Sequence, residues 1–500
     1  MAIQILSLSE AKKPADILFA GCFQKEKPAK TLAAAEPVFS KAVLGAIESG
    51  RFAGKADEIF RSYGPGAKAS ELVLLGLGEK AKYKVENSRR IGARMIEIAR
   101  AAKAKRIAVL LETFCAGSVS VQDAAGALAE MQVLGFYDFD RYKSKAKDED
   151  PKPREVDVEL LIEKKAVSAA VQKKADWAQI VAKGVVRARD LINEPGNVMN
   201  PPRLAEEARK LAAEKKISCK ILGLAELKAL KMQGILAVNQ GSVTPPALIV
   251  LEYGKKYQNK GTVCLVGKGV TFDTGGISIK PAKDMEKMKY DMAGAAAVIA
   301  FMGVAADLKI PVHIVALAPA VENNVAENPQ RPGDIIRLYN GKTVEVINTD
   351  AEGRLILADA LAYAGKFGPK AMIDLATLTG MCAYTFGDKA IGLLGNDEKL
   401  LGRVKKAGLE AGEKCWELPL WDEYAELIKG HHSDLLNSGG SFAGTITAAK
   451  FLQEFVPAKT PWAHLDIAGV AWTDSKRFDC PKGATGAGVR LLVALFSDWK

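Results

Sequence analysis

Several features that would assign this 500-residue chain to a familiar class are missing from its sequence. Its longest apolar stretches, such as residues 293–304 and 314–321, are shorter than the roughly 20 residues that a membrane helix needs. The N-terminus has no basic segment followed by an apolar core, so we expect neither export nor a membrane location and predict a cytoplasmic protein. No Cys-x-x-Cys pair occurs among the seven cysteines, which favours reduced thiols over zinc or redox chemistry.

Common catalytic and nucleotide-binding motifs are absent as well. The four histidines do not form a His-Glu-x-x-His helix, which argues against a single-zinc peptidase of that type. His313 and His464 lie in apolar, strand-like runs and are predicted to be core residues, whereas His431 and His432 follow Gly430 in a predicted solvated turn. Neither a Gly-x-Ser-x-Gly serine motif nor a phosphate-binding Gly-x-x-x-x-Gly-Lys-Ser/Thr loop is found.

The chain does carry a basic excess. Its net charge is +11, from 70 basic and 59 acidic residues. Residues 1–175 contain 30 basic and 23 acidic side chains, so +7 of this excess lies in the N-terminal third. Such a bias suits either binding to a polyanion such as DNA or simple solubility.

Hydrophobic patterning predicts an α/β protein with two domains. In the N-terminal domain, residues 1–170, short β-rich runs alternate with helical patterns. A long helical pattern at about 166–193 is predicted to be a connecting helix at the start of the second domain, residues 171–500. Apolar strands recur between helical patterns in that second domain, which predicts a buried, mixed or parallel central sheet.

Charged residues cluster where the strands of the second domain end. They include the carboxylates Asp273, Asp291, Asp350 and Glu352 and the cations Lys268, Lys280 and Arg354. Strand ends line the ligand crevice in open α/β sheets. Four carboxylates balance two divalent ions, and oxygen ligands suit Mn, Mg or Zn. Lys280 and Arg354 would then be free to stabilise a developing oxyanion or a bound anion, which is a hydrolytic arrangement.

Each of these residues taken alone also has a structural interpretation. Asp350 alone would also suit the N-cap of a following helix, with Glu352 complementing the helix dipole. Lys280 and Arg354 alone would also suit surface cations. Paired divalent ions with spare cations would also suit a two-metal phosphoesterase, so composition alone leaves the reaction open.

Longer motifs narrow the range of reactions that this charged cluster could catalyse. The octapeptide Asn-Thr-Asp-Ala-Glu-Gly-Arg-Leu at 348–355 matches in full the signature of the leucyl aminopeptidase (cytosol aminopeptidase) family. Supporting matches occur at 266–281, 288–295, 331–334, 376–380 and 462–472. From about residue 190 to its end, the chain closely resembles the bacterial aminopeptidase A branch of this family.

The resemblance implies a ligand set for two metal ions, Mn or Zn and possibly Mg. Asp273 and Glu352 would bridge the ions, Asp350 would complete one site, and Lys268 and Asp291 would complete the other. A lysine ligand must lose its proton, which from a pKa near 10.4 costs roughly 4–5 kcal/mol at pH 7. Nearby dications and burial would have to offset that cost.

The resemblance also implies the reaction and the assembly. Such an enzyme would release N-terminal Leu and similar residues from peptides, with Arg354 holding a bicarbonate general base and Lys280 steadying the gem-diolate. The side-chain pocket would be lined by Met285 and by residues 376–380, including Thr377, Leu378, Thr379 and Gly380. A homohexamer with a macro-like N-terminal domain is implied, and DNA binding by some bacterial relatives makes a DNA-binding role the alternative hypothesis.

Overall fold

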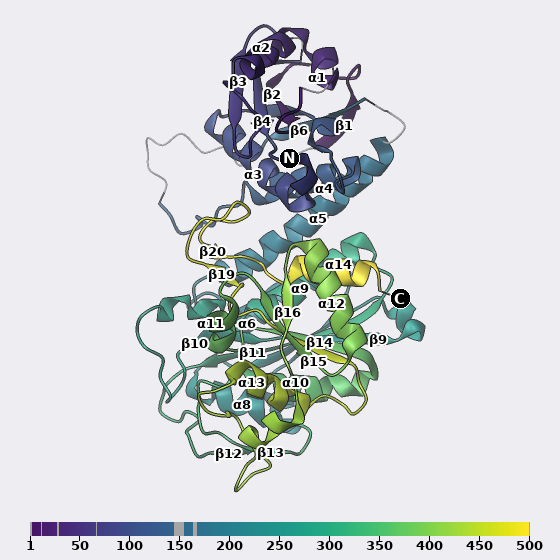
Figure 1. Ribbon diagram of the computed structural model, residues 1–500. Helices are drawn as coiled ribbons and strands as arrows, with labels where there is room; N and C mark the ends of the chain where they lie inside the picture. The colour runs from purple at the N-terminus through teal and green to yellow at the C-terminus, as the bar shows by residue number, and fades with distance from the viewer. Residues whose placement is uncertain are drawn as a thin grey trace. The chain divides into compact units, whose positions relative to one another are not determined.

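The structure is a computed structural model that describes residues 3–11, 13–27, 30–66, 68–144, 155–163 and 168–499. The chain forms two compact units, residues 1–183 with 476–481 and residues 184–475 with 482–500 (Figure 1). It passes from the first unit to the second within helix α5, Ser168–Asn193. This helix occupies the range predicted for the connecting helix, of which residues 166 and 167 lie outside the described residues.

The N-terminal unit is built on a six-stranded sheet in the order β1-β6-β5-β2-β4-β3. Its strands run parallel to one another except β3, which pairs antiparallel with β4. The strands are β1 Ile3–Ser7, β2 Ala15–Cys22, β3 Ile59–Tyr63, β4 Ala69–Gly76, β5 Arg106–Leu110 and β6 Asp157–Ile162. The helices are α1 Lys30–Ala35, α2 Pro37–Glu48, α3 Val85–Ala101 and α4 Val121–Leu134.

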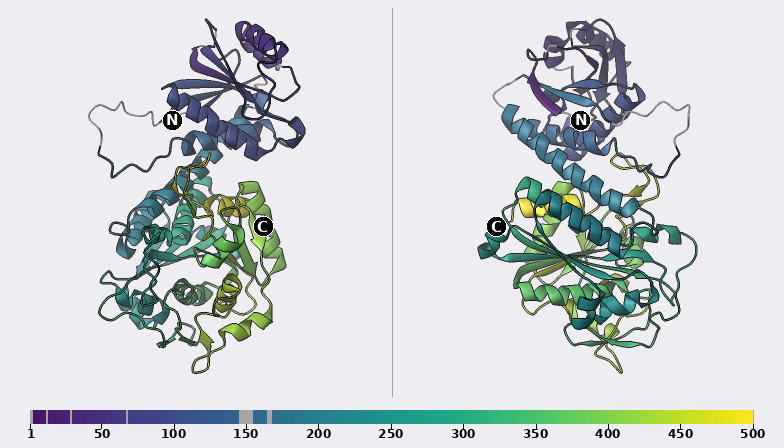
Figure 2. Two further views of the ribbon diagram at one scale, coloured as in Figure 1. Left: turned by 60° about the vertical axis from the view of Figure 1, so that its left-hand side comes forward. Right: turned by 180° about the vertical axis from the view of Figure 1, so that it is seen from behind.

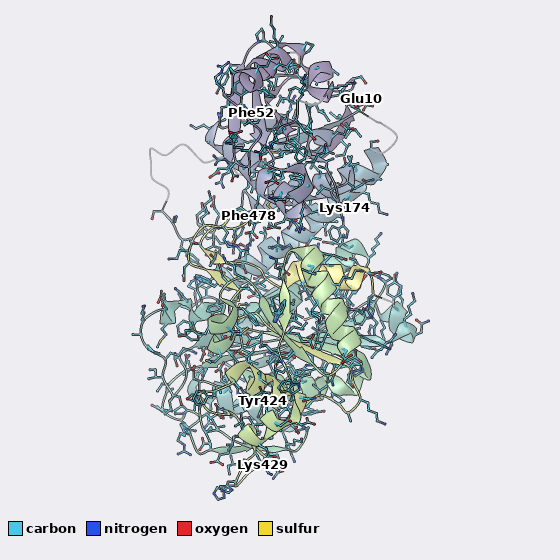
Figure 3. The ribbon with its side chains drawn as sticks, viewed as in Figure 1. Glu10, Phe52, Lys174, Tyr424, Lys429 and Phe478 are labelled. Carbon is cyan, nitrogen blue, oxygen red and sulfur yellow. The ribbon has the colours of Figure 1, made fainter. Side chains whose placement is uncertain are left out.

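Both faces of this sheet are covered, as the alternation of side chains along β2 shows. Ile17 and Phe19 join the core formed with α3 and α4, whereas Leu18 joins the core formed with α1 and α2. Successive strand residues point to opposite faces, so a continuous apolar strand must be buried on both sides. Phe52, labelled in Figure 3, is buried in the second of these cores.

The second unit contains a nine-stranded mixed sheet in the order β16-β15-β18-β14-β9-β11-β8-β7, with β10 added beside β11. Strands β9, β10, β11, β14 and β18 run parallel, whereas β7, β8 and β15 pair antiparallel with their neighbours β8, β11 and β18. This confirms the predicted mixed sheet. The strands are β7 Ser218–Leu222, β8 Ala247–Tyr253, β9 Thr262–Gly267, β10 Gly269–Asp273, β11 His313–Asn323, β14 Pro369–Ala376, β15 Ile391–Gly395, β16 Cys415–Glu417 and β18 Trp462–Asp466.

Helices cover both faces of the large sheet (Figures 1 and 2). Helices α9, α12 and α14 lie on one face, and α8, α10 and α13 lie on the other. The helices are α6 Pro201–Lys215, α7 Leu224–Ala229, α8 Gln233–Val238, α9 Ala293–Leu308, α10 Gly353–Ala364, α11 Gly380–Phe386, α12 Glu398–Ala411, α13 Gly444–Gln453 and α14 Val489–Ser497. Short strands complete the unit: β12 Ile335–Arg337, β13 Thr343–Glu345, β17 Leu435–Leu436, β19 Trp472–Thr473 and β20 Gly483–Ala484.

Helix α9 is apolar on all sides and lies in the centre of this unit. It contacts β9, β11 and β14 on one side and α6 and α14 on the other. Together with the preceding turn, residues 285–308 are long and apolar enough to cross a membrane, but 83% of the apolar window is buried inside the unit. An all-round apolar helix is expected in a large protein core, so this segment gives no support to a membrane span.

Candidate metal centre

The functional residues lie where parallel strands end. Lys268 directly follows β9, Asp273 is the last residue of β10, and Thr377 directly follows β14. Asp291 precedes α9, and the segment 348–352 precedes α10. Because β9, β10 and β14 run in the same direction, their carboxyl ends meet at one edge of the sheet. The sequence clusters at 266–273, 288–295 and 348–355 are therefore brought together, as predicted.

Two glycines allow this close approach. A Cβ on Gly353 would lie 2.4 Å from the side chain of Lys268, and a Cβ on Gly294 would lie 2.0 Å from the carbonyl oxygen of Leu375. Neither position can hold a larger residue without moving its neighbours. The glycine of the octapeptide thus makes room for the buried lysine.

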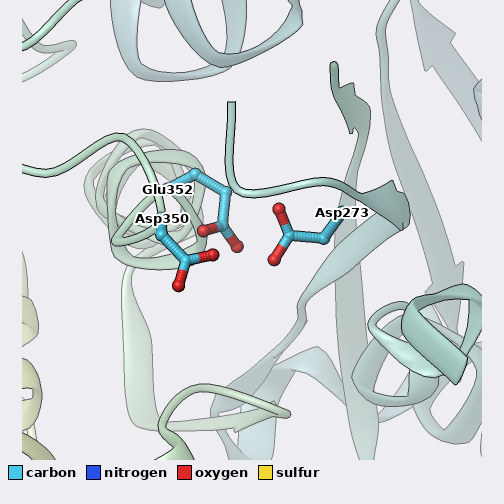
Figure 4. A group of neighbouring side chains, drawn as sticks. All are labelled: Asp273, Asp350 and Glu352. Atoms are coloured by element: carbon cyan, nitrogen blue, oxygen red, sulfur yellow. The ribbon is translucent and has the colours of Figure 1, made fainter. Parts of the chain in front are cut away.

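Three carboxylates point toward one another at this edge (Figure 4). Asp273, Asp350 and Glu352 each offer an oxygen, and these oxygens lie within 4.8 Å of one another. Asp273 and Glu352 are only 2% and 1% exposed. Burying like charges so closely is strongly unfavourable unless cations compensate them.

Two lysines supply part of that compensation. The ammonium of Lys268 lies 2.7 Å from Asp291 and 2.9 Å from Glu352, and it donates a 2.9 Å hydrogen bond to the carbonyl oxygen of Thr377. Burial by itself lowers the pKa of Lys268, but the surrounding carboxylates outweigh it and raise that pKa above its ordinary value. Lys280 Nζ lies 2.8 Å from Asp273 and 2.5 Å from Asp350.

The carboxyl groups themselves are perturbed. Burial, reinforced by the Glu352 and Asp273 carboxylates, raises the pKa of Asp350 to about 6. Burial also raises the pKa of Asp291 well above its usual range, despite the opposing charge of Lys268. When ionised, the four carboxylates Asp273, Asp291, Asp350 and Glu352 exceed in charge the ammonium groups of Lys268 and Lys280 that they contact, which favours the uptake of further cations.

The donor set fits divalent metal ions. Asp291 Oδ2, Asp350 Oδ1 and Glu352 Oε1 are buried and lie near a lysine ammonium, but they accept no well-angled hydrogen bond. Hard oxygen ligands with open lone pairs suit Mn, Mg or Zn. The predicted ligands Lys268, Asp273, Asp291, Asp350 and Glu352 thus form one connected cluster.

Arg354 lies beside this cluster at the start of α10. One guanidinium nitrogen donates a 2.8 Å hydrogen bond to the backbone oxygen of Asn437, whereas its Nε has no hydrogen-bond partner. Burial lowers the pKa of Arg354 to about 10, so it stays a cation at neutral pH. Arg354 is 7% exposed, which contradicts the alternative that it is a surface cation.

The predicted pocket residues lie in two places. Thr377 Oγ1 donates to Asp291 at 2.7 Å, and Thr379 Oγ1 donates to Asp466 at 2.6 Å, so residues 377–380 border the metal cluster. Met285 lines a separate hollow of about 380 Å³, whose walls also include Ile279, Glu322 and Val325 but none of residues 377–380.

The chain is similar to known proteins over nearly its whole length. The family model described as the cytosol aminopeptidase family, catalytic domain, matches residues 186–493, and the family's N-terminal domain model matches residues 20–146. A probable cytosol aminopeptidase from Roseiflexus castenholzii is 47% identical over 91% of this chain and 92% of the relative. Another from Syntrophotalea carbinolica is 44% identical over 97% of both chains. This chain belongs to the cytosol aminopeptidase family.

Solved structures of the family agree with this fold. A mutant of tomato leucine aminopeptidase is 32% identical, with a TM-score of 0.86 over 99% of this chain and 96% of that chain. The bottromycin maturation enzyme BotP in complex with Mn is 30% identical, with a TM-score of 0.85 over 97% of this chain and 99% of that chain. Family membership makes the chain a metal-dependent aminopeptidase, a peptidase that removes N-terminal residues.

Three buried polar residues that support the site were missed by the sequence analysis. Asn323 donates to Asp273 at 2.8 Å and to the carbonyl oxygen of Thr349 at 3.1 Å. Asp466 accepts hydrogen bonds from the backbone N–H of Leu378 and from Thr379. Asn437 contacts the octapeptide through its side chain. Asn323 and Asp466 each end a strand, β11 and β18, and Asp466 also lies within the matched segment 462–472, so these signals were available in the sequence.

Proposed function

We propose that this family member is a leucyl aminopeptidase that uses two divalent metal ions. The observation that carries the proposal is the cluster of four carboxylates and Lys268 at the carboxyl edge of the sheet, in which buried negative charge exceeds the available cations. Asp273 and Glu352 would contact both ions, Asp350 would serve one, and Lys268 and Asp291 would serve the other. Mn or Zn are the expected ions, with Mg possible.

The ions would polarise the scissile carbonyl and lower the pKa of a water molecule to near neutrality. Lys268 would bind as a neutral amine, so an ion must compete with its proton, and the carboxylates around Lys268 oppose the loss of that proton. Glu352 and Asp291, which hold the ammonium at 2.9 and 2.7 Å, would keep the amine in the same place once it is neutral.

Lys280 and Arg354 would act on the substrate. The Lys280 ammonium lies between Asp273 and Asp350 and is 21% exposed, so it can reach a peptide oxygen and stabilise the gem-diolate. Arg354 has a buried nitrogen with no hydrogen-bond partner, and a bicarbonate ion held there would accept the proton of the attacking water. Once two divalent ions balanced the four carboxylates, the charges of Lys280 and Arg354 would be available to act on the substrate.

Residues 377–380 would form the pocket for the N-terminal side chain, whereas Met285 lines the separate hollow and is not assigned to that pocket. Thr377 directly contacts Asp291, so this segment lies next to the place where the α-amine and scissile carbonyl would meet the ions. An apolar pocket discriminates between substrates that differ by one methylene by only about 1–3 kcal/mol. We therefore expect preference for Leu and similar residues rather than strict selection. The enzyme would be a cytoplasmic homohexamer.

The test is hydrolysis of leucine p-nitroanilide with added Mn, compared with chelator-treated protein. We expect activity with Mn that the chelator abolishes. N-acetyl-leucine p-nitroanilide is the matched control, because acetylation removes the free α-amine that would meet the ions and should abolish cleavage. Equal cleavage of the two substrates would contradict the assignment, and turnover of p-nitrophenyl phosphate instead would favour a two-metal phosphoesterase.

The DNA-binding alternative is not proposed. The DNA-binding hypothesis was based on the excess of basic residues in the N-terminal third. Many of the cations there have acidic partners. Arg89 lies 2.9 Å from Glu130, and Arg100 lies 2.5 Å from Asp138. Paired charges give a weaker field than a basic stripe. A salt-dependent gel shift with duplex DNA would revive the hypothesis.

A further inference from the structure

The octapeptide segment is contacted from outside by the buried side chain of Asn437, which makes four hydrogen bonds to this stretch of backbone. Asn437 follows β17, and its side chain is inaccessible to solvent. Its Oδ1 accepts hydrogen bonds from the backbone N–H groups of Ile347 and Asn348 at 2.9 and 3.3 Å. Its Nδ2 donates to the backbone oxygens of Asn348 and Ala351 at 2.6 and 3.3 Å. All four hydrogen-bonding positions of the carboxamide are therefore used on residues 347–351.

These bonds extend a strand pairing that ends just before them. Strands β13 and β17 run parallel, with Val344 opposite Leu435 and Glu345 opposite Leu436. The backbone N–H of Asn437 adds a 3.0 Å bond to the oxygen of Glu345. Beyond that point the chain turns toward the metal cluster and backbone pairing stops. The Asn437 carboxamide, which carries the same donor and acceptor groups as a peptide unit, continues the pairing.

The same residue also reaches Arg354. Its backbone oxygen accepts the 2.8 Å hydrogen bond from the Arg354 guanidinium. Asn437 thus contacts the segment that carries Asp350 and Glu352 and, separately, the cation that follows them. Ligand-bearing loops without such support sample several conformations, so groups behind a metal site tune its affinity.

We propose that Asn437 is a positioning residue that holds the Asp350–Glu352 loop and Arg354 in the arrangement needed to bind metal. The proposal rests on the metal-binding function proposed above. It predicts that loss of the carboxamide weakens Mn binding about 10–100-fold, as for other groups behind metal ligands, with a similar fall in kcat and little change in KM.

The first experiment measures the Mn dissociation constant by calorimetry on the full-length protein and on the Asn437→Asp and Asn437→Ala variants. Asn437→Asp keeps the acceptor for Ile347 and Asn348 but faces the oxygens of Asn348 and Ala351 with another oxygen. We expect both variants to bind Mn more weakly. Unchanged Mn affinity in a folded variant would overturn the proposal. If the wild type binds no Mn, the proposed function fails instead, so the two failures are distinguishable.

A matched control separates positioning from general stability. Gln132 is another fully buried carboxamide, and it donates a 2.8 Å bond to the oxygen of Val156 in the N-terminal unit. Gln132→Ala should lower the thermal midpoint but leave Mn affinity and kcat unchanged. A purely structural role for Asn437 would give the same pattern, with a lower midpoint and normal Mn affinity, and would refute the proposal.

A second measurement needs no variant. The backbone N–H groups of Ile347 and Asn348 bond to Asn437 Oδ1, so hydrogen exchange of the wild-type protein should show both amides protected. We expect added Mn to increase this protection, because it stabilises the loop that Asn437 holds. Exchange of both amides at the rate of an unstructured peptide would show that the bonds do not persist and would overturn the proposal even if the variants failed to fold.

Discussion

The two units of this chain share one architecture but differ in the residues at the ends of their parallel strands, which are uncharged in one unit and include charged residues in the other. Each has a mainly parallel or mixed sheet with helices on both faces. In the N-terminal unit, strands β2, β4 and β5 end in Cys22, Gly76 and Leu110, which are uncharged. In the catalytic unit, β10 and β18 end in buried aspartates, and Lys268 directly follows β9.

The difference in charge burial distinguishes the N-terminal unit from the unit that carries the candidate site. In the N-terminal unit the Lys80–Glu26 pair is half exposed and contributes little stability, and the more buried Arg89–Glu130 pair joins one cation to one carboxylate. The catalytic unit buries Lys268, Asp291 and Glu352 together, at a desolvation cost that folding alone does not require. A group of buried charges in excess of their partners therefore marks the place where a ligand completes the structure.

The largest effect is expected when one of those buried charges is removed. Glu352→Ala should lose bound metal and lower kcat/KM by more than the roughly 10–100-fold typical of residues behind a ligand, because Glu352 is proposed to contact both ions. Metal content by mass spectrometry and leucine p-nitroanilide hydrolysis provide the measurement. Glu413→Gln is the control, since Glu413 is also a buried carboxylate but caps α14 through the N–H groups of Gly488 and Leu491. A Glu352 variant that retains full metal would contradict the assignment.

Replacing the cations should separate catalysis from metal binding. Lys280→Ala and Arg354→Ala are each expected to lower kcat about 100-fold, in the range found when one donor to a developing oxyanion is removed. Metal content should survive, because neither residue is a proposed ligand. Parallel metal analysis and steady-state kinetics test this. Loss of metal in either variant would show that its role is to hold the site together rather than to act on substrate.

Features of the fold and the candidate site were predictable when the residues involved lie close together in the sequence. The proposed ligands Asp350 and Glu352 and the cation Arg354 could be picked out from the sequence because they lie within one continuous motif, and the two-domain α/β architecture followed from apolar periodicity. Asn437 was not found, because its partners lie 86–90 residues earlier in the chain and an isolated asparagine in a loop carries no pattern. The pairing of β1 with β6, which joins Ile3 to Val158, was equally hidden. Local motifs identify chemistry, whereas the side chains that position it become visible only in three dimensions.

A buried carboxylate away from the metal cluster provides a smaller test. Asp359 on α10 accepts hydrogen bonds from the backbone N–H groups of Ile235 and Tyr339, and burial raises its pKa to about 7. Because the folded-state pKa lies above the unfolded value near 3.9, this group's stabilising contribution is fully present below pH 4 and is lost as the pH rises toward 7. The loss should be on the order of a few kcal/mol.

Asp359→Asn removes this titration while keeping a neutral side chain of the same shape. The stability of the variant relative to the wild type should therefore improve between pH 5 and pH 8, measured as the difference in thermal midpoints at each pH. A difference that is the same at both pH values would show that Asp359 does not titrate in this range.

The smallest effect is expected in the N-terminal unit. Lys80 and Glu26 form a 2.8 Å ion pair, with side chains 52% and 42% exposed, and the Lys80 ammonium also lies 5.5 Å from the centre of the Phe23 ring. Lys80→Ala alone would mix the two interactions, so a double-mutant cycle with Glu26→Ala is needed. We expect a coupling of about 0.2–1 kcal/mol in urea denaturation, reduced further in 1 M salt, with unchanged aminopeptidase activity. A coupling of several kcal/mol that resists salt would mean that this unit also relies on charge for its structure, and buried charge would no longer distinguish the catalytic unit.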